Sequence, residues 1–398
     1  MIFMSPYETP LYFVIFGIAV LPLGLLLYSG KKRLWYQCAL TVFFLYMSFG
    51  GAHYRQGIAL IAYLVFQAVL STAYFKYRQQ HDATPVFVIV TLLAILPLTL
   101  VKLSPVVSES LSTAGFLGIS YLTFRSVQVI IETRDGLITE FGPLRYVQFL
   151  VFLPTISAGP IDRYRRFAAA LAAPPRPDRY AELAGRGIHH LFMGFLYNYI
   201  IAHLLGNMLL PHVKEYVFSG GGFLGLLSYM YVYSLFLFFD FAGYSKFAIG
   251  AACLMGYEIP PNFDKPFLSG SIKEFWNRWH MSLSFWFRDY VYMRLMMFFL
   301  KKKIFKSKTA ASNIAYFALF LLMGAWHGLT WYYIAYGLYH AAMICLNDGW
   351  LRYKKRRTGR ARQGRFVRAL SVAGTFHVVC VSFLIFSGFL NELWERAG

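Results

Sequence analysis

Two histidines, His280 and His327, are the residues of this chain whose type and setting could do chemistry. Each lies in a largely apolar stretch flanked by tryptophan, in WNRWH (276–280) and in WHG (326–328). An imidazole titrates near neutral pH, which suits it to accept and return protons. Because an ionisable side chain inside a membrane is costly, its presence there indicates a function. The alternative for each is a neutral histidine hydrogen-bonded between packed helices.

The depth of His327 follows from the length of the apolar run before it. Residues 312–327 would extend about 22 Å as a helix, so His327 would lie inside a hydrocarbon core about 30 Å thick. Gly324 and Gly328 beside it are small, so we expect backbone or substrate to approach closely. A plain helical hairpin through this region instead places His327 nearer the outer face.

The surroundings of His280 are more polar. If residues 276–289 form a continuous helix, Trp276, His280 and Ser284 share one face. The candidates for binding substrate or supporting the site are Trp276, Asn277, Ser284, Arg288, Asp289 and, beside His327, Trp326. The alternative is a polar helix stabilised by its own network. A proton-coupled transporter could use the same two histidines, so composition does not separate transport from catalysis.

Several other chemistries are set aside. The chain has no G-x-S-x-G elbow, no H-E-x-x-H and no P-loop. Cys38, Cys253, Cys345 and Cys380 lie in apolar segments without C-x-x-C or Cys/His ligand spacing, so we predict small buried residues and no metal site. Asp240 is expected to be a structural partner of an interior Arg or Lys.

The composition is that of an integral membrane protein. The 398 residues are 58% hydrophobic and 14% charged, whereas soluble globular proteins have about 25% charged residues. No run shows sustained strand alternation, and an open sheet could not survive in lipid. We therefore predict an all-α polytopic membrane protein.

The expected spans are apolar runs of about 20 residues. They cover residues 10–29, 35–52, 57–75, 85–103, 186–210, 224–256, 312–332, 333–351 and 367–391. Residues 114–131, interrupted by Arg125 and Gln128, and residues 144–159 are expected to be shorter or tilted spans. The first run has no basic residues before it, so we expect an uncleaved first helix.

Three regions break this pattern. Residues 160–185 are expected to form a loop or a helix on the cytoplasmic face. Residues 257–300 are too polar to face lipid and too aromatic for an ordinary loop, so we predict short broken or re-entrant helices inside the bundle. Residues 352–368 are a basic cytoplasmic connector. We expect one integral membrane domain over residues 1–398, with N-terminal spans in 1–110.

The net charge of +20 is concentrated in short polar stretches. They are residues 31–33, 76–78, 163–166, 301–308 and 352–368. The positive-inside rule places such stretches in the cytoplasm, with the N-terminus and the end of the final span outside. A second use is docking of an acidic partner. Nucleic acid is not expected as a partner, because no folded basic domain is present to bind it.

Residues 261–292, PNFDKPFLSGSIKEFWNRWHMSLSFWFRDYVY, resemble the core motif of the membrane-bound O-acyltransferase (MBOAT) family. Residues 323–331, MGAWHGLTW, are similar to its second motif. Weaker matches are ISAGPIDRYRRF at 156–167 and FDFAGYSKFAIG at 239–250. The motifs keep their order over residues 115–350, about half of the chain.

Within the family, WHMSLSFWFRDYVYMRL (279–295) most resembles the branch that transfers D-alanine in Gram-positive bacteria. Relatives that acetylate alginate tend to have Pro-Leu-Gly where this chain has Met293-Arg294-Leu295. The resemblance implies an MBOAT fold, with roughly 11 transmembrane helices and short broken helices around a central tunnel. It also maps the family's active histidine to His327 and its second motif position to His280.

The function implied by the resemblance is O-acyl transfer in lipoteichoic acid biosynthesis for the cell wall. D-alanine would arrive as a thioester on the 4'-phosphopantetheine of an acidic, DltC-like D-alanyl carrier protein in the cytoplasm. The chain itself would bind no cofactor. An extracellular-facing DltD-like partner, and a small membrane peptide, would act with it. A surface helix within residues 257–300 would be the dock for the carrier.

In this scheme His327 acts as general base on an acceptor hydroxyl, and His280 holds substrate or stabilises the oxyanion. One alternative function is polysaccharide O-acetylation by another member of the family. A second alternative, from a different class, is a proton-coupled exporter or flippase.

Overall fold

The computed structural model describes residues 4–31, 34–107, 112, 115–358 and 364–397. Two compact units are distinguished along the chain and are described separately. The first unit comprises Met1–Gly194 and Tyr244–Pro260, and the second comprises Phe195–Gly243 and Pro261–Gly398. The prediction of one domain over the whole chain stays a prediction.

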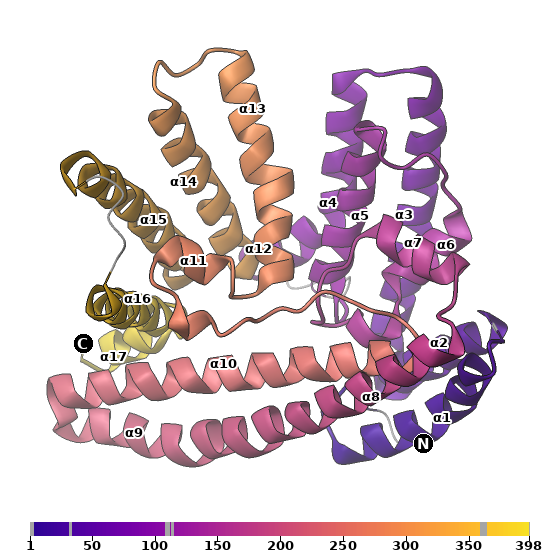
Figure 1. Ribbon diagram of the computed structural model, residues 1–398, viewed down its shortest axis with the longest axis horizontal. Coiled ribbons are helices and arrows are strands. Elements are labelled where there is room, and N and C mark those ends of the chain that lie inside the picture. Colours follow the sequence, from indigo (N-terminus) through magenta and orange to yellow (C-terminus); the bar gives the residue numbers. More distant parts are fainter. Residues whose placement is uncertain (1–3, 32–33, 108–111, 113–114, 359–363, 398) are drawn as a thin grey trace. The chain divides into compact units, whose positions relative to one another are not determined.

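The regular secondary structure in the described part of the first unit is helical, with helices α3, α4 and α5 side by side (Figure 1). Its helices are α1 (Pro10–Tyr28), α2 (Leu34–Phe49), α3 (Tyr54–Gln80), α4 (Thr84–Val107), α5 (Ile119–Arg134), α6 (Pro143–Leu150), α7 (Tyr164–Ala172) and α8 (Pro177–Gly194), with short 3-10 turns at Gly51–His53 and Leu153–Thr155.

The second unit combines long helices with short ones around the polar region predicted from the sequence. Its α-helices are α9 (Leu210–Tyr216), α10 (Gly222–Leu254, whose last turns belong to the first unit), α11 (Ile272–Trp276), α12 (Met281–Phe287), α13 (Met293–Lys301), α14 (Lys308–His327), α15 (Trp331–Thr358), α16 (Arg365–Phe386) and α17 (Phe389–Ala397). A 3-10 turn forms at Pro266–Leu268, and π-helical segments form at Phe195–Ala202, Leu204–Leu209, Val217–Gly221 and Arg288–Tyr292.

Local sequence signals fix where key helices begin. The Thr9 hydroxyl accepts a hydrogen bond from the Tyr12 amide at the start of α1. At α11, the Ser271 hydroxyl accepts from the Glu274 amide at 3.1 Å, and the Glu274 carboxylate accepts from the Gly270 amide at 2.9 Å. These bonds satisfy amide groups that a helix start leaves without partners. The five-residue helix α11 therefore begins at a defined point, directly before the histidine motif.

Six of the described helices are long and apolar enough to cross a membrane. On α1, the outward face carries Val14, Ile18, Leu21 and Leu25, which are 57–70% exposed. A soluble helix would place polar residues there, so this face is suited to lipid. The chain is accordingly a multi-pass membrane protein. The expected total of roughly 11 spans stays a prediction.

Two details of the predicted spans are wrong. Residues 144–159 form the short helix α6 and a 3-10 turn, not a span. The final run, 367–391, ends at Phe386, because Gly388 has a left-handed φ of 74° before α17 starts. Residues 160–185, for which a loop or a helix was predicted, consist largely of helices α7 and the start of α8. The basic connector is helical through Thr358, and residues 359–363 lie outside the described part.

The polar residues that interrupt the apolar run 114–131 lie on helix α5, inside the first unit. Nearly all of its residues are buried, including Arg125 and Gln128, which are fully buried. The Arg125 guanidinium donates to the carbonyl oxygens of Leu150 at 2.8 Å and Thr155 at 2.6 Å, and also to that of Phe149. These are carbonyls that the end of α6 and the following turn leave free. Arg125 therefore holds the irregular chain after α6 against α5.

Replacing Arg125 with Met should destabilise the first unit, because buried carbonyls lose their donor. Each unsatisfied buried group costs about 1–3 kcal/mol, so we expect a loss of several kcal/mol, measured by unfolding of the detergent-solubilised protein. Arg179→Gln is the control, because Arg179 pairs with Glu182 and Glu258 at the surface, where ion pairs contribute little. Equal stability of the two variants would contradict the role of Arg125.

Candidate functional site

His280 lies in a turn between two short helices. Helix α11 ends at Trp276 and α12 begins at Met281, and His280 between them has a left-handed φ of 42°. The prediction that Trp276, His280 and Ser284 share the face of one helix is therefore wrong. The prediction of short broken helices in this region is confirmed. Only 5% of the His280 surface is exposed.

An extended segment holds this turn by main-chain hydrogen bonds. The Met281 amide donates to the Asn262 carbonyl at 2.8 Å, and the Asp264 amide donates to the Arg278 carbonyl at 3.0 Å. The Ser282 hydroxyl also donates to the Asn262 side-chain oxygen at 2.6 Å. A left-handed conformation is uncommon for residues other than glycine and persists where surrounding contacts fix it. The segment around Asn262 supplies those contacts.

His327 is the last residue of α14 and is half-buried among aromatic rings. Its ring centroid lies 4.9 Å from that of Phe386 and 6.0 Å from that of Tyr336, both edge-to-face. Trp326 is its direct neighbour, at 4.5 Å between centroids. The sequence prediction left the depth of His327 open, and the structure places the residue at a helix end enclosed by side chains.

The small residues near His327 allow α14 and α15 to approach closely. A Cβ atom on Gly324 would lie 2.5 Å from the Tyr333 carbonyl oxygen, and one on Gly337 would lie 2.2 Å from the Phe320 carbonyl oxygen. Neither distance is possible for real atoms, so both positions require glycine for packing. The expected close approach at Gly324 is confirmed, and the partner is the backbone of α15.

Both histidines line one cavity of about 70 Å³ in the second unit. The other walls are aromatic, aliphatic or thioether side chains: Leu237, Phe241, Trp276, Trp279, Leu283, Met323, Tyr336, Phe383 and Phe386. In such an apolar enclosure a neutral imidazole is favoured over the charged form. The arrangement suits proton transfer by a neutral base away from bulk water.

A second cavity of about 310 Å³ shares Trp276 and Met323 with the histidine cavity. Three of the predicted supporting residues, Asn277, Ser284 and Arg288, line this second cavity instead. Their polar groups therefore adjoin the histidine cavity without entering it.

Asp289 lies apart from both cavities. Its carboxylate pairs with Arg288 at 2.8 Å, and the Arg288 side chain is exposed whereas that of Asp289 is half-buried. We expect it to support structure only.

His340 is a third buried histidine that the sequence analysis missed. It is fully buried on α15, and its Nδ1 accepts a hydrogen bond from the Trp276 indole N–H at 3.2 Å. Its ring also contacts Tyr336, at 4.6 Å between centroids. His340 thus fixes the orientation of the tryptophan that separates the two cavities. The sequence carried a signal for it, because His340 is an ionisable residue inside an apolar span, as are His280 and His327.

Asp240 has a different partner from the one expected. Its carboxylate accepts a hydrogen bond from the Asn198 amide at 2.8 Å, so the predicted Arg or Lys partner is wrong. The four cysteines are free. Cys253 and Cys380 are buried, as predicted, whereas the prediction is wrong for Cys38 and Cys345, which are only partly buried. No group of three His, Cys, Asp or Glu side chains that could hold a metal occurs within the described residues.

Comparison with known proteins relates the whole chain to one family. Residues 44–363 match the MBOAT, or membrane-bound O-acyltransferase, family. A teichoic acid D-alanyltransferase of Streptococcus thermophilus is 45% identical over 98% of this chain and 97% of its own length. A teichoic acid D-alanyltransferase of Lacticaseibacillus rhamnosus is 46% identical over 99% of this chain and 100% of its own length. A probable alginate O-acetylase of Pseudomonas aeruginosa is 31% identical over 68% of this chain and 48% of its own length.

The different burial of the histidines predicts an order of chemical modification. Diethyl pyrocarbonate should modify the exposed His81 first, then the half-buried His327, and His280 and His340 last, because access of the reagent limits the rate. Peptide mapping by mass spectrometry against time gives the four rates. Modification of His280 or His340 as fast as His81 would contradict the enclosed site.

Proposed function

The chain belongs to the membrane-bound O-acyltransferase family, and from this premise we propose that it transfers D-alanine toward teichoic acid in a Gram-positive bacterium. The D-alanyltransferases of Streptococcus thermophilus and Lacticaseibacillus rhamnosus are similar to it over nearly their whole length. The resemblance to the D-alanyl transfer branch, typified by DltB, is thereby confirmed. The observation that carries the mechanism is the single cavity lined by His280 and His327.

The proposed reaction moves an acyl group from sulfur to oxygen. His327, as a neutral imidazole, removes the proton from an acceptor hydroxyl as the oxygen attacks the thioester carbonyl. A C–O bond forms and the C–S bond breaks, and the proton held by His327 passes to the departing thiolate. No metal or redox partner is needed for this balance.

His280 is proposed to bind the acyl group or the acceptor during this reaction. A ring N–H aimed at the carbonyl oxygen would stabilise the negative charge that develops there. The fixed left-handed backbone and the packing against Phe241, at 4.6 Å between centroids, hold the ring in one orientation. A preoriented donor loses little free energy to reorganisation during the reaction.

The second cavity is proposed to receive the 4'-phosphopantetheine arm of the donor, because it adjoins the histidines across Trp276 and Met323. Lys273 and Arg288 line it, paired with Asp348 and Asp289, and their N–H groups are proposed to bind the phosphate group. Asn277 and Ser284 offer hydrogen-bonding groups to the amides of the arm. Trp326 packs against His327 and is proposed to support it.

The proposed donor is an acidic D-alanyl carrier protein, DltC-like, bound from the cytoplasm. Helix α13 exposes Met297 and Phe298 and leads directly into lysines 301–303. An apolar centre beside positive charges suits an acidic partner. On the outer side, a DltD-like partner and a small membrane peptide are proposed to pass the D-alanine on to lipoteichoic acid.

Polysaccharide O-acetylation is less favoured as the function. The alginate O-acetylase relative is less similar and matches less of the chain than the D-alanyltransferases do. An exporter or flippase would move labelled substrate without changing its covalent state, whereas the proposed enzyme forms a new ester.

Replacing His327 with Ala should lower D-alanine esters on teichoic acid by at least about a hundredfold, because general base catalysis contributes about 10²–10⁴ in rate. His280→Ala should also lower them. The measurement is ester-linked D-alanine released from cell walls, in cells whose membrane content of each variant is equal.

His189→Ala is the matched control, because His189 is exposed on α8 and lines neither histidine cavity nor its neighbour. Wild-type ester levels are expected for it. Wild-type levels for His327→Ala would overturn the assignment of the base.

Carrier binding should weaken as salt rises through physiological strength, because the Debye length falls to about 8 Å at 0.15 M and exposed charges are screened. Replacing lysines 301–303 with glutamine should flatten this dependence. Affinity can be measured by biolayer interferometry on the solubilised protein. Salt-independent binding by the unsubstituted chain would contradict electrostatic docking and indicate an apolar dock.

A further inference from the structure

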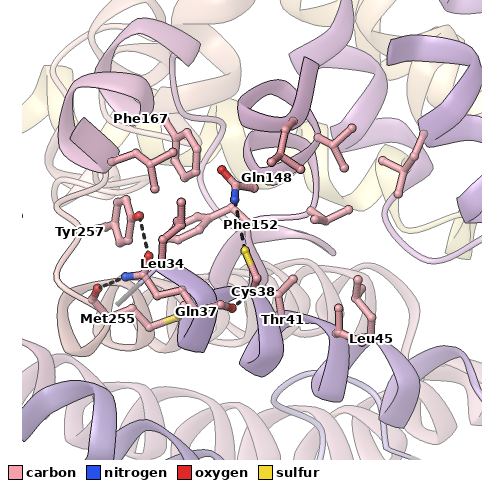
Figure 2. Close-up of a pocket in the computed structure, with 16 residues that line it drawn as sticks. Leu34, Gln37, Cys38, Thr41, Leu45, Gln148, Phe152, Phe167, Met255 and Tyr257 are labelled. Atoms are coloured by element: carbon pink, nitrogen blue, oxygen red, sulfur yellow. Dashed lines mark hydrogen bonds between the residues drawn. The ribbon is translucent and has the colours of Figure 1, made fainter. Parts of the chain in front are cut away.

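The first unit contains a cavity of about 270 Å³ that the proposed reaction does not use. Figure 2 shows its lining, in which α2 supplies one face of a helix. That face comprises Leu34, Gln37, Cys38, Thr41, Val42 and Leu45. The opposite walls come from α6, α7, one residue of α3 and the chain around Tyr257. The volume is several times the roughly 30 Å³ that one water occupies in the liquid, so a larger guest fits.

The cavity is polar at one end and apolar at the other. Near the start of α2, Tyr257 donates to the Gln37 side-chain oxygen at 3.2 Å, and Gln37 donates to the Met255 carbonyl at 3.4 Å (Figure 2). Gln148 donates to the Cys38 sulfur at 3.2 Å. Further along α2 the lining is aliphatic. Because these polar groups already bond one another, the cavity suits a guest that is itself apolar.

The length of the cavity corresponds to one leaflet of a bilayer. From Leu34 to Leu45, α2 rises about 16 Å, about half of a hydrocarbon core roughly 30 Å thick. Leu64, which lines the deep end, lies on α3 about 15 Å from the start of that helix at Tyr54. Both helices therefore place the deep end of the cavity near the bilayer midplane.

The cavity is open to the surroundings of the spans. Val42 and Leu144 line it, yet they are 65% and 70% exposed. In a membrane protein such residues face acyl chains. A lipid could therefore enter sideways without any rearrangement of the helices.

Lys31 is exposed and lies three residues before Leu34, the first residue of α2. The basic run Lys31-Lys32-Arg33 directly precedes Leu34 in the sequence. Basic residues at the membrane surface attract anionic lipids. We propose that this cavity binds one acyl chain of an anionic glycerophospholipid of the cytoplasmic leaflet, with the lipid phosphate near Lys31, just before α2 begins. This proposal concerns a separate cavity and does not depend on the proposed transferase activity.

The test is native mass spectrometry of the whole protein, delipidated in detergent and titrated with phosphatidylglycerol. Thr41→Trp fills the cavity and should remove one tightly bound lipid. Phe43→Trp is the matched control, because Phe43 is on the same helix, 45% exposed, and outside the cavity lining; it should bind lipid as the wild type does. Undiminished occupancy in Thr41→Trp would overturn the proposal.

The phosphate contact is tested by replacing residues 31–33 with glutamine. Each positive charge near an anionic surface contributes about fivefold in affinity, so phosphatidylglycerol binding should weaken by at least about tenfold. Phosphatidylcholine with the same chains should be affected little. The control is the equivalent triple change at lysines 301–303 in the second unit, which should leave this site unchanged. Equal binding of both lipids by the wild type would contradict the proposed preference for an anionic headgroup.

Alkylation of Cys38 gives a second measurement that does not require a bulky substitution. In a protein whose other three cysteines are alanine, N-ethylmaleimide should modify Cys38, which is half-buried in the cavity wall. Phosphatidylglycerol should slow that reaction several-fold. A rate unaffected by lipid would show that no chain occupies the cavity and would overturn the proposal even if Thr41→Trp fails to fold.

Discussion

The site depends on main-chain hydrogen bonds that hold the turn between α11 and α12 against the extended segment around Asn262. They hold residues 277–280 away from the helical path of α11. The left-handed residue at His280 is an unfavourable conformation, and the bonds from Met281 and Asp264 fix it. As a result Trp276 at the end of α11 and His280 in the turn after it both line one cavity.

Close packing of α14 and α15 supplies the other half of that cavity. Gly324 and Gly337 let the two backbones approach, and this brings Tyr336 and His340 of α15 beside residues of α14 and α11. His327 ends its helix at this contact. The hydrogen bond from Trp276 to His340 then joins the two halves, because it ties α11 to α15. A larger side chain at either glycine would move His327 relative to His280. Such a substitution would slow the proposed acyl transfer although the substituted residue does not contact the substrate.

The sequence predicted the helices and both histidines, because apolar runs and motif residues are local signals. It did not predict the turn at His280, because the periodicity of side chains does not reveal a backbone held by Asn262, 18 positions earlier. Arg125 appeared to interrupt a span, whereas it satisfies carbonyls at the end of α6. His340 has no motif around it, and its importance follows from a contact 64 residues away in the sequence.

The central claim is that a neutral imidazole in an apolar enclosure drives transfer of an acyl group from a thioester. The direct measurement is single-turnover discharge of labelled D-alanyl carrier by the purified protein in liposomes with an acceptor present. His327→Asn keeps a polar side chain of similar size and should bind the carrier normally while discharging it at least about a hundredfold more slowly. Discharge at the wild-type rate by that variant would contradict the account.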